Sequence, residues 1–149
     1  MEFAEIIIPR PIYSTFTYRI PPELQDKVKI GFRVLVSFGP KRFYTGIVTY
    51  LHNNKPEGYE VKNIIAVLDE QPVIRHPQLK FWEWIASYYL CSIGEVYKAA
   101  VPAGLKLESE TFVSANPDYM DTEEQKLTER EALVYTYLLT KNKQTPNEI

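Results

Sequence analysis

A chain of 149 residues is long enough for one ordinary domain, or for one domain and part of a second. Hydrophobic residues make up 45% and charged residues 24%, which is typical of a soluble globular protein and excludes disorder as the default state. The net charge of -2 argues against a broad nucleic-acid-binding surface, but residues 1–106 carry 13 Lys or Arg against 10 Asp or Glu, whereas residues 107–149 carry 4 against 9. An anionic partner of the first part would therefore be held locally.

Cysteine and histidine are rare. Cys91 is the only cysteine, which excludes an internal disulfide framework and a multi-cysteine zinc site in this sequence. Neither His52 nor His76 has a ligand-spaced neighbour, so we expect no metal site and no catalytic residues here. The first 30 residues lack a signal-peptide pattern, and no stretch approaches the roughly 20 apolar residues of a membrane span. We expect a cytoplasmic protein with no membrane partner.

The first half of the chain is rich in strand patterns. Residues 2–21 mix β-branched and aromatic residues with three prolines, which predicts two short strands broken by bends. Residues 29–39 alternate apolar and polar side chains and stop at Gly39-Pro40. Residues 42–51 resume the strand pattern, so the short connection between them predicts a hairpin. Together these segments predict a small, strongly bent antiparallel sheet or barrel.

Helical patterns follow. Residues 52–60 are polar and turn-rich, which predicts an exposed loop before a further strand over 61–69. Residues 76–90 predict an amphipathic helix, with apolar side chains spaced by three and four residues. The predicted apolar face consists of Leu79, Trp82, Ile85, Ala86 and Tyr89. Residues 94–105 predict a second, short helix closed by Pro102 and Gly104.

The remaining residues predict a separate unit. Residues 107–125 combine a strand pattern with an acidic, turn-rich run that is typical of a linker. Thr128 and Glu131 have the capping-box spacing and open a helix with apolar residues at Leu133, Val134, Tyr137 and Leu138. Residues 145–149 look like the first turn of another helix, so we expect the chain to stop inside a domain.

Catalytic motifs are missing from the sequence: there is no phosphate-binding G-x-x-x-x-G-K-[ST] loop, no G-x-S-x-G elbow and no H-E-x-x-H. The remaining candidates are aromatic and basic groups on the predicted strands. Binding the end of a nucleic acid requires a flat surface for a base, a polar partner for its edge or sugar, and a cation for phosphate. Phe16, Thr17 and Tyr18 would supply the first two.

The cations for phosphate, and a backbone position that a ligand can approach closely, lie outside residues 16–18. Lys41, Arg42 and Lys62 would contact phosphate, and Gly39 would let a ligand approach the main chain. The alternative is that the rings of Phe16 and Tyr18 build the core, as alternate rings on a strand usually do. Positions 16 and 18 share one strand face and position 17 the other, so a ligand touching all three must reach a strand end or edge.

Four stretches, in this order, resemble one family. They are RPIYSTFTYRIP (10–21), GFRVLVSFGPKRFYTGIV (31–48), VKNIIAVLDEQPVI (61–74) and WIASYYLCSIGEVYKAAVP (84–102). The sequence resembles the amino-terminal region of the PriA family of primosomal replication-restart helicases over about residues 3–106. LTEREALVYTYLL (127–139) is similar to the opening of the winged-helix domain that follows in that family.

The resemblance implies a domain that holds the 3' end of the nascent leading strand at an abandoned replication fork. The family's pocket residues fall on Phe16, Tyr18, Gly39 and Lys62 of this sequence. Thr17 stands where the family has an aspartate. A threonine hydroxyl carries no charge to repel a terminal phosphate, so we expect softer discrimination between 3'-hydroxyl and 3'-phosphate ends.

We therefore predict an α+β chain with three parts. A bent, β-barrel-like (OB-like) domain with a packed helix occupies residues 1–106 and binds DNA 3' ends, 107–125 form a linker, and 126–149 begin a truncated winged helix. The resemblance implies that the full-length protein is an ATP-dependent 3'-5' DNA helicase that uses ATP, magnesium and zinc, associates with the nucleoid, and works with primosome and single-strand-binding proteins. We expect no cofactor and no enzyme activity within these residues.

Two other function classes stay open on the residues alone. A general single-strand DNA binder of OB type would bind internal segments as well as ends, with affinity that grows with strand length. A structural or protein-interaction barrel would bind no DNA, and Lys62→Ala would change nothing. An enzyme would need an acid, base or metal constellation that the sequence does not offer.

Overall fold

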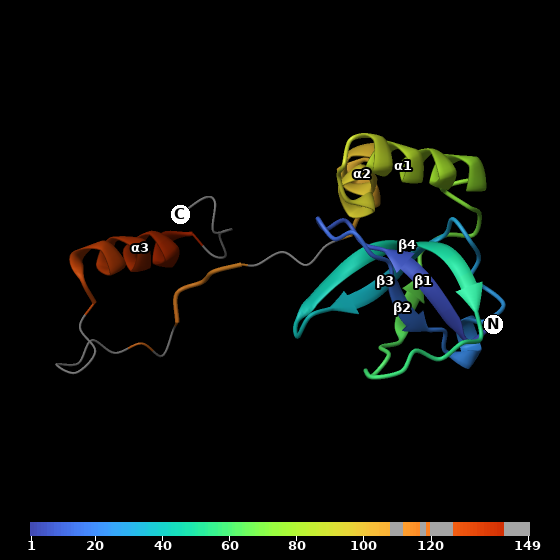
Figure 1. Cartoon of the computed structure of the whole chain (residues 1–149). Helices are drawn as coiled ribbons and strands as arrows, with labels where there is room; N and C mark the ends of the chain where they lie inside the picture. The colour runs from blue at the N-terminus through green and yellow to red at the C-terminus, as the bar shows by residue number, and fades with distance from the viewer. Residues whose placement is uncertain (108–111, 117–118, 120–126, 142–149) are drawn as a thin grey trace. The chain divides into compact units, whose positions relative to one another are not determined.

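The computed structural model describes residues 1–107, 112–116, 119 and 127–141. By its contacts the chain divides into two compact units, residues 1–109 and 110–149. The first unit contains a five-stranded sheet followed by two α-helices (Figure 1), which confirms the α+β class. Its strands are β1 (Phe3–Ile7), β2 (Phe16–Arg19), β3 (Arg33–Phe38), β4 (Arg42–His52) and β5 (Ile64–Val67).

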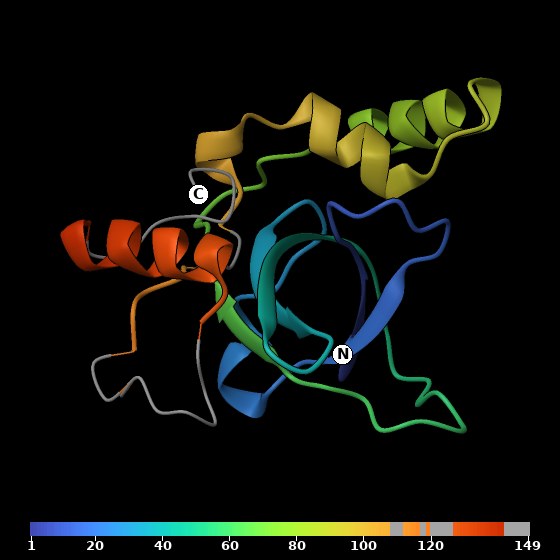
Figure 2. The same ribbon diagram turned by 90° about the vertical axis from the view of Figure 1, so that its left-hand side faces the viewer.

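The sheet curls into an OB-like barrel. Its strands are antiparallel in the order β2-β1-β4-β3-β5, and the predicted hairpin joins β3 to β4. The two edges meet where the Arg19 backbone N–H donates to the Lys62 carbonyl at 2.9 Å, beside a bridge between Arg19 and Asn63. Register shifts at Glu5/Ile6 and at Leu35/Val36 add the local bends that a strongly curled sheet needs. Figure 2 shows the strands curling around a common centre.

The predicted alternation of residues 29–39 is confirmed, and one set of alternate side chains is buried. Phe32, Val34 and Val36 are buried, while Arg33 and the other polar-side positions of this segment are only partly covered. Val34 and Val36 belong to the interior cluster, whose other members come from the other strands and their connections: Ala4, Ile6, Ile8, Tyr18, Ile20, Val28, Tyr44, Val48 and Ile64. Because one strand face is entirely apolar, the register of the sheet is firmly specified.

Helices α1 (His76–Tyr88) and α2 (Ile93–Ala100) pack on the outer face of β1 and β4. A second core forms there from Ile7 and Ile47 of the strands and from Leu79, Trp82, Val96 and Tyr97 of the helices. The Tyr97 hydroxyl donates to the buried Thr45 carbonyl at 2.8 Å. Gly94 allows the close approach, because a Cβ there would lie 1.9 Å from the Arg10 carbonyl oxygen.

One prediction about α1 is wrong. Leu79 and Trp82 are buried, and Ile85 and Ala86 are partly buried, but Tyr89 is 67% exposed. The helix ends at Tyr88, and Tyr89 takes a non-helical C-cap conformation, so its ring leaves the apolar face. The residues Phe81, Trp84, Tyr88 and Tyr89 instead form an exposed aromatic stripe, with successive ring centroids 4.9–5.8 Å apart.

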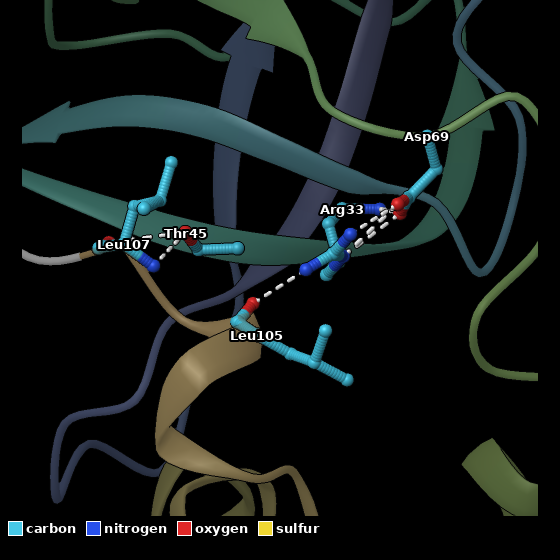
Figure 3. Close-up of polar contacts among 5 residues, drawn as sticks. All are labelled: Arg33, Thr45, Asp69, Leu105 and Leu107. Atoms are coloured by element: carbon cyan, nitrogen blue, oxygen red, sulfur yellow. Dashed lines mark hydrogen bonds and ion pairs between the residues drawn. The ribbon is translucent and has the colours of Figure 1, made fainter.

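The segment after α2 is fixed to the barrel by polar contacts (Figure 3). The Arg33 guanidinium pairs with Asp69 at 2.5 Å and also donates to the Leu105 carbonyl at 2.8 Å. The Thr45 backbone N–H donates to the Leu107 carbonyl at 2.8 Å, and the Leu107 N–H donates to the Thr45 hydroxyl at 2.7 Å. These bonds attach residue 107 to the first unit.

The second unit contains α3 (Glu129–Thr140). Its predicted capping box is confirmed, since Thr128 Oγ1 accepts from the Glu131 N–H and the Glu131 carboxylate accepts from the Thr128 N–H. Leu138 is buried, whereas Leu133 is 72% exposed. The predicted further helix turn over 145–149 lies outside the described residues, and the winged-helix assignment stays a prediction. None of the helices described has the length and apolar character needed to cross a membrane.

Candidate nucleic-acid interface

A small pocket lies where β2, the β3–β4 turn and the segment before β5 meet. Its volume is about 180 Å³, and its lining combines Phe16, Thr17, Tyr18, Ser37, Phe38, Gly39, Tyr59, Glu60 and Lys62. Typical sites for drug-sized ligands measure roughly 300–1,000 Å³, so this pocket suits one planar group. Of the seven residues predicted to contact a DNA end, five are in this lining: Phe16, Thr17, Tyr18, Gly39 and Lys62.

The two rings of β2 are not equally accessible. Tyr18 is only 4% exposed, and its hydroxyl donates to the Ser37 carbonyl at 2.9 Å inside the barrel. Burial raises the pKa of Tyr18 to about 12, so the phenol stays a neutral donor. Phe16 is partly exposed and contacts Phe38 edge-on, with ring centroids 4.8 Å apart. Phe16 is therefore the ring of β2 that a ligand can reach. Tyr18 is buried and joins β2 to β3 through its bond to Ser37.

Gly39 and Lys62 approach each other across the pocket. The Lys62 Nζ donates to the Gly39 carbonyl at 2.7 Å, and an ammonium group has two further N–H donors for a phosphate. Gly39 has a φ of +71° at the start of the β3–β4 turn, a conformation that favours glycine, and nothing lies within 4 Å of its missing Cβ. The backbone contact between Arg19 and Lys62 fixes the lysine beside β2.

Thr17 lies directly opposite Glu5 in the pairing of β2 with β1. Its hydroxyl donates to Glu5 Oε1 at 2.5 Å, while Thr15 donates to Oε2 at 2.6 Å and His52 Nε2 lies 3.1 Å from Oε1. Burial raises the pKa of Glu5, but the hydrogen bonds from Thr15, Thr17 and His52 outweigh it and hold the pKa below its ordinary value. The Glu5 carboxylate is therefore hydrogen-bonded to Thr17, a residue of the pocket lining.

Lys41 and Arg42 do not reach the pocket lining. Lys41 belongs to the β3–β4 turn and Arg42 opens β4, and both are exposed. Their contacts with phosphate stay predictions. In the turn that joins β3 to β4, only Gly39 lines the pocket.

Sequence reasoning missed part of the lining. Tyr59 is 57% exposed and Glu60 is exposed, and both come from the loop that was predicted to be simply polar. A single aromatic residue in an otherwise polar, turn-rich loop was the available signal. Among the described residues no three His, Cys, Asp or Glu side chains are grouped closely enough to hold a metal ion.

An OB-like barrel with a pocket of rings, backbone and one cation at its margin is the architecture of nucleic-acid-binding barrels. The model of the PriA 3' DNA-binding domain (3'BD) family matches residues 5–102, and the chain belongs to this family.

Curated relatives carry the same name. The replication restart protein PriA of Bacillus subtilis is 28% identical over 141 residues, which is 91% of this chain and 18% of the relative. Replication restart protein PriA of Treponema pallidum is 29% identical over 66% of this chain and 16% of its own length. The Rickettsia conorii protein of the same name is 31% identical over 68% of this chain and 15% of its own length. The chain thus spans less than a fifth of the length of these relatives.

Proposed function

We propose that residues 1–107 bind the 3' end of a DNA strand, the nascent leading strand of a stalled or abandoned replication fork. One observation carries the proposal: three segments far apart in sequence converge on one small pocket that offers a ring, a backbone carbonyl and a cation. A pocket of about 180 Å³ favours a single terminal nucleotide over a longer run of bases.

Each part of the pocket has a role in this proposal. The terminal base stacks on Phe16 and on the exposed ring of Tyr59, the sugar lies against the Gly39 backbone, and Lys62 neutralises the adjoining phosphate. Nothing in this arrangement reads base edges in a groove, so binding is independent of sequence. Stacking on one platform contributes about 1–3 kcal/mol per base, and a single pocket therefore binds weakly.

The wider context follows from the family. In the full-length protein this domain would be the recognition part of an ATP-dependent 3'-5' DNA helicase that restarts replication by primosome assembly. Forked DNA, primosome proteins and single-strand-binding protein are the proposed partners. ATP, magnesium and zinc would serve that larger protein, in the cytoplasm and at the nucleoid.

The proposal is tested by fluorescence anisotropy at low salt on this chain. We expect tighter binding to a fork with a free leading-strand 3' hydroxyl than to the same fork with that end recessed. Lys62→Ala should weaken fork binding about tenfold, because it removes a charged donor to phosphate. Lys98→Ala, in α2 and away from the pocket lining, is the matched control and should change nothing.

A general single-strand binder would give a different result. Its affinity would grow with strand length and would be the same for a circular strand without ends. Either finding would contradict end recognition. Absence of any DNA binding, with Lys62→Ala equal to the unmodified chain, would support a structural or protein-interaction barrel.

A further inference from the structure

A second cavity, larger than the pocket at β2, lies between α1 and the outer face of the sheet, where Figure 1 shows the helix above β1 and β4. Its volume is about 770 Å³, within the roughly 300–1,000 Å³ of typical ligand sites. Its lining includes Ile7, Thr15 and Thr49 from the side of the sheet, and Leu79, Glu83, Ala86, Leu90 and Cys91 from α1 and the turn after it. This α1 cavity shares no lining residue with the pocket at β2.

Both threonines lie on the face of the sheet that α1 covers. Ala4 and Ile6 belong to the barrel interior, so Glu5 between them lies on the outer face. Thr15 Oγ1 donates to Glu5 Oε2 at 2.6 Å. Thr49 is the unpaired residue at the register shift between β1 and β4, and its hydroxyl donates to the Glu5 carbonyl at 3.1 Å. A hydroxyl has one proton, so a ligand group that contacts either threonine oxygen must itself donate.

The charged groups around the α1 cavity favour a cation. Within the described part of the chain, Glu83 lines the cavity and no Lys or Arg does, while the Glu5 carboxylate lies one hydrogen bond behind Thr15. Lys80 pairs with Glu83 at 2.8 Å, but both side chains are exposed, so the pair contributes little and a ligand cation can replace Lys80. A phosphate group would meet carboxylates and no cation in the lining, so the cavity is unsuited to DNA.

Leu90 stands at the edge of this cavity in an unfavourable state. It is 83% exposed, and its φ of +53° is the only positive φ of a non-glycine residue in the described ranges. The Cys91 N–H donates to the Ala86 carbonyl at 3.1 Å, which gives Leu90 the position after a helix where glycine is usual. Backbone strain and exposure of a large apolar side chain therefore fall on one residue, which points to a role outside the fold.

A second exposed side chain extends the apolar edge. Tyr13, in the loop before β2, also lines the α1 cavity and is 78% exposed. Exposed apolar side chains next to a cavity enlarge the surface that an occupant can cover, which is typical of protein–protein contacts. The occupant that these features fit is a polypeptide.

We propose that the α1 cavity docks a segment of a partner protein that presents an arginine beside an apolar side chain. The guanidinium donates to Glu83 and to the threonine oxygens, and the apolar side chain covers Leu90. Arginine suits the cavity better than lysine, because its planar group has five N–H donors for acceptors on different residues. The first unit would then bind DNA at β2 and a protein at α1, through separate residues.

The test uses three blocked tripeptides and the thiol of Cys91, which lines the cavity and is the only cysteine of the chain. The probes are Ac-Leu-Arg-Leu-NH2 and its analogues with citrulline or glutamate in the centre. Each is titrated while iodoacetamide alkylates Cys91, and the readout is the peptide concentration that gives half of the maximal protection. We expect the arginine peptide to protect at about a tenfold lower concentration than the citrulline peptide, which lacks the charge. The glutamate peptide and forked DNA should not protect.

Two variants locate the effect. Glu83→Gln should remove most of the preference for arginine over citrulline, at least about threefold, because it removes the lining carboxylate. Leu90→Gly should raise the urea unfolding midpoint, since glycine adopts this φ without strain, and yet weaken protection by the arginine peptide at least about threefold. A purely structural leucine would not change stability and binding in opposite directions. Glu70→Gln, an exposed carboxylate outside the cavity lining, is the matched control.

Three results would overturn the inference: no protection by the arginine peptide, equal protection by the citrulline peptide, or unchanged preference in Glu83→Gln. Protection of Cys91 that rises with the concentration of the chain itself, without peptide, would assign the cavity to a second copy and would also overturn it. Glu83→Gln and Leu90→Gly should bind forked DNA like the unmodified chain. The inference can therefore fail while the proposed function stands, and the reverse.

Discussion

Two aromatic regions of the first unit differ in what surrounds their rings. On β2 the rings have partners inside the barrel, since the Tyr18 hydroxyl bonds to a backbone carbonyl and Phe16 packs against Phe38. On α1 and its C-cap residue the stripe of Phe81, Trp84, Tyr88 and Tyr89 is 53–67% exposed, and its rings contact one another in succession. The strand rings therefore combine packing with a pocket, whereas the helix rings add little to the core.

The difference shows that an aromatic residue's role depends on which face of its element the fold covers. α1 carries large apolar residues on opposite faces, with Trp82 buried and Trp84 exposed two positions later. A helix turns about 100° per residue, so two positions move a side chain to the far side. Only contact with the barrel decides which of the two faces is buried.

The largest effect should separate the two tryptophans of α1. Trp82 is 5% exposed and stacks on Tyr97 with centroids 5.8 Å apart, so Trp82→Ala should lower the free energy of unfolding by about 3–5 kcal/mol. Trp84→Ala should lower it by less than about 1 kcal/mol, because only exposed ring contacts are lost. Urea unfolding followed by far-UV circular dichroism measures both. Equal losses would mean that the exposed stripe also holds the fold together.

A smaller effect should separate the two rings of β2. Phe16→Leu keeps apolar volume against Phe38 but removes the flat face, so it should weaken binding of a 3'-ended strand by up to about 1–3 kcal/mol. Tyr18→Phe should leave binding unchanged and lower the free energy of unfolding by about 1 kcal/mol, because the Ser37 carbonyl loses its donor. Anisotropy and urea unfolding on both variants test the separation, and a loss of binding in Tyr18→Phe would contradict it.

Several elements were predictable because their signals are local. Alternation along β3, the Gly39-Pro40 stop and the capping of α3 each depend on a few neighbouring residues, and the structure confirms the elements they predict. Residue spacing also implied that a ligand touching positions 16 to 18 must reach the margin of the sheet. The pocket lies beside β2, which is the first strand in the order of the sheet.

The rest depended on contacts between distant residues. Nothing near Thr17 in sequence announces Glu5, because their contact requires the pairing of β1 with β2. Tyr59 joins the pocket because its loop precedes β5, whose neighbouring residues meet β2. Tyr89 was misplaced since periodicity continues past the residue where a helix ends. Pairing register and helix termination are set by tertiary packing, which residue spacing alone does not carry.

The smallest effect should distinguish two carboxylates, one beside the pocket and one on α1. The pKa of Glu5 in the folded chain is lowered from its ordinary value of 4.5, so the carboxylate stabilises the fold above that value. This stabilisation is lost as the pH falls through the lowered pKa, where Glu5 takes up a proton and can no longer accept from three donors. Urea unfolding midpoints should therefore fall with acid more steeply in the unmodified chain than in Glu5→Gln. Glu83→Gln is the control, because the Glu83 pair with Lys80 is exposed and exposed pairs contribute little. If Glu83→Gln flattened the acid limb as much as Glu5→Gln, the hydrogen-bonded carboxylate of the barrel would have no special part in stability.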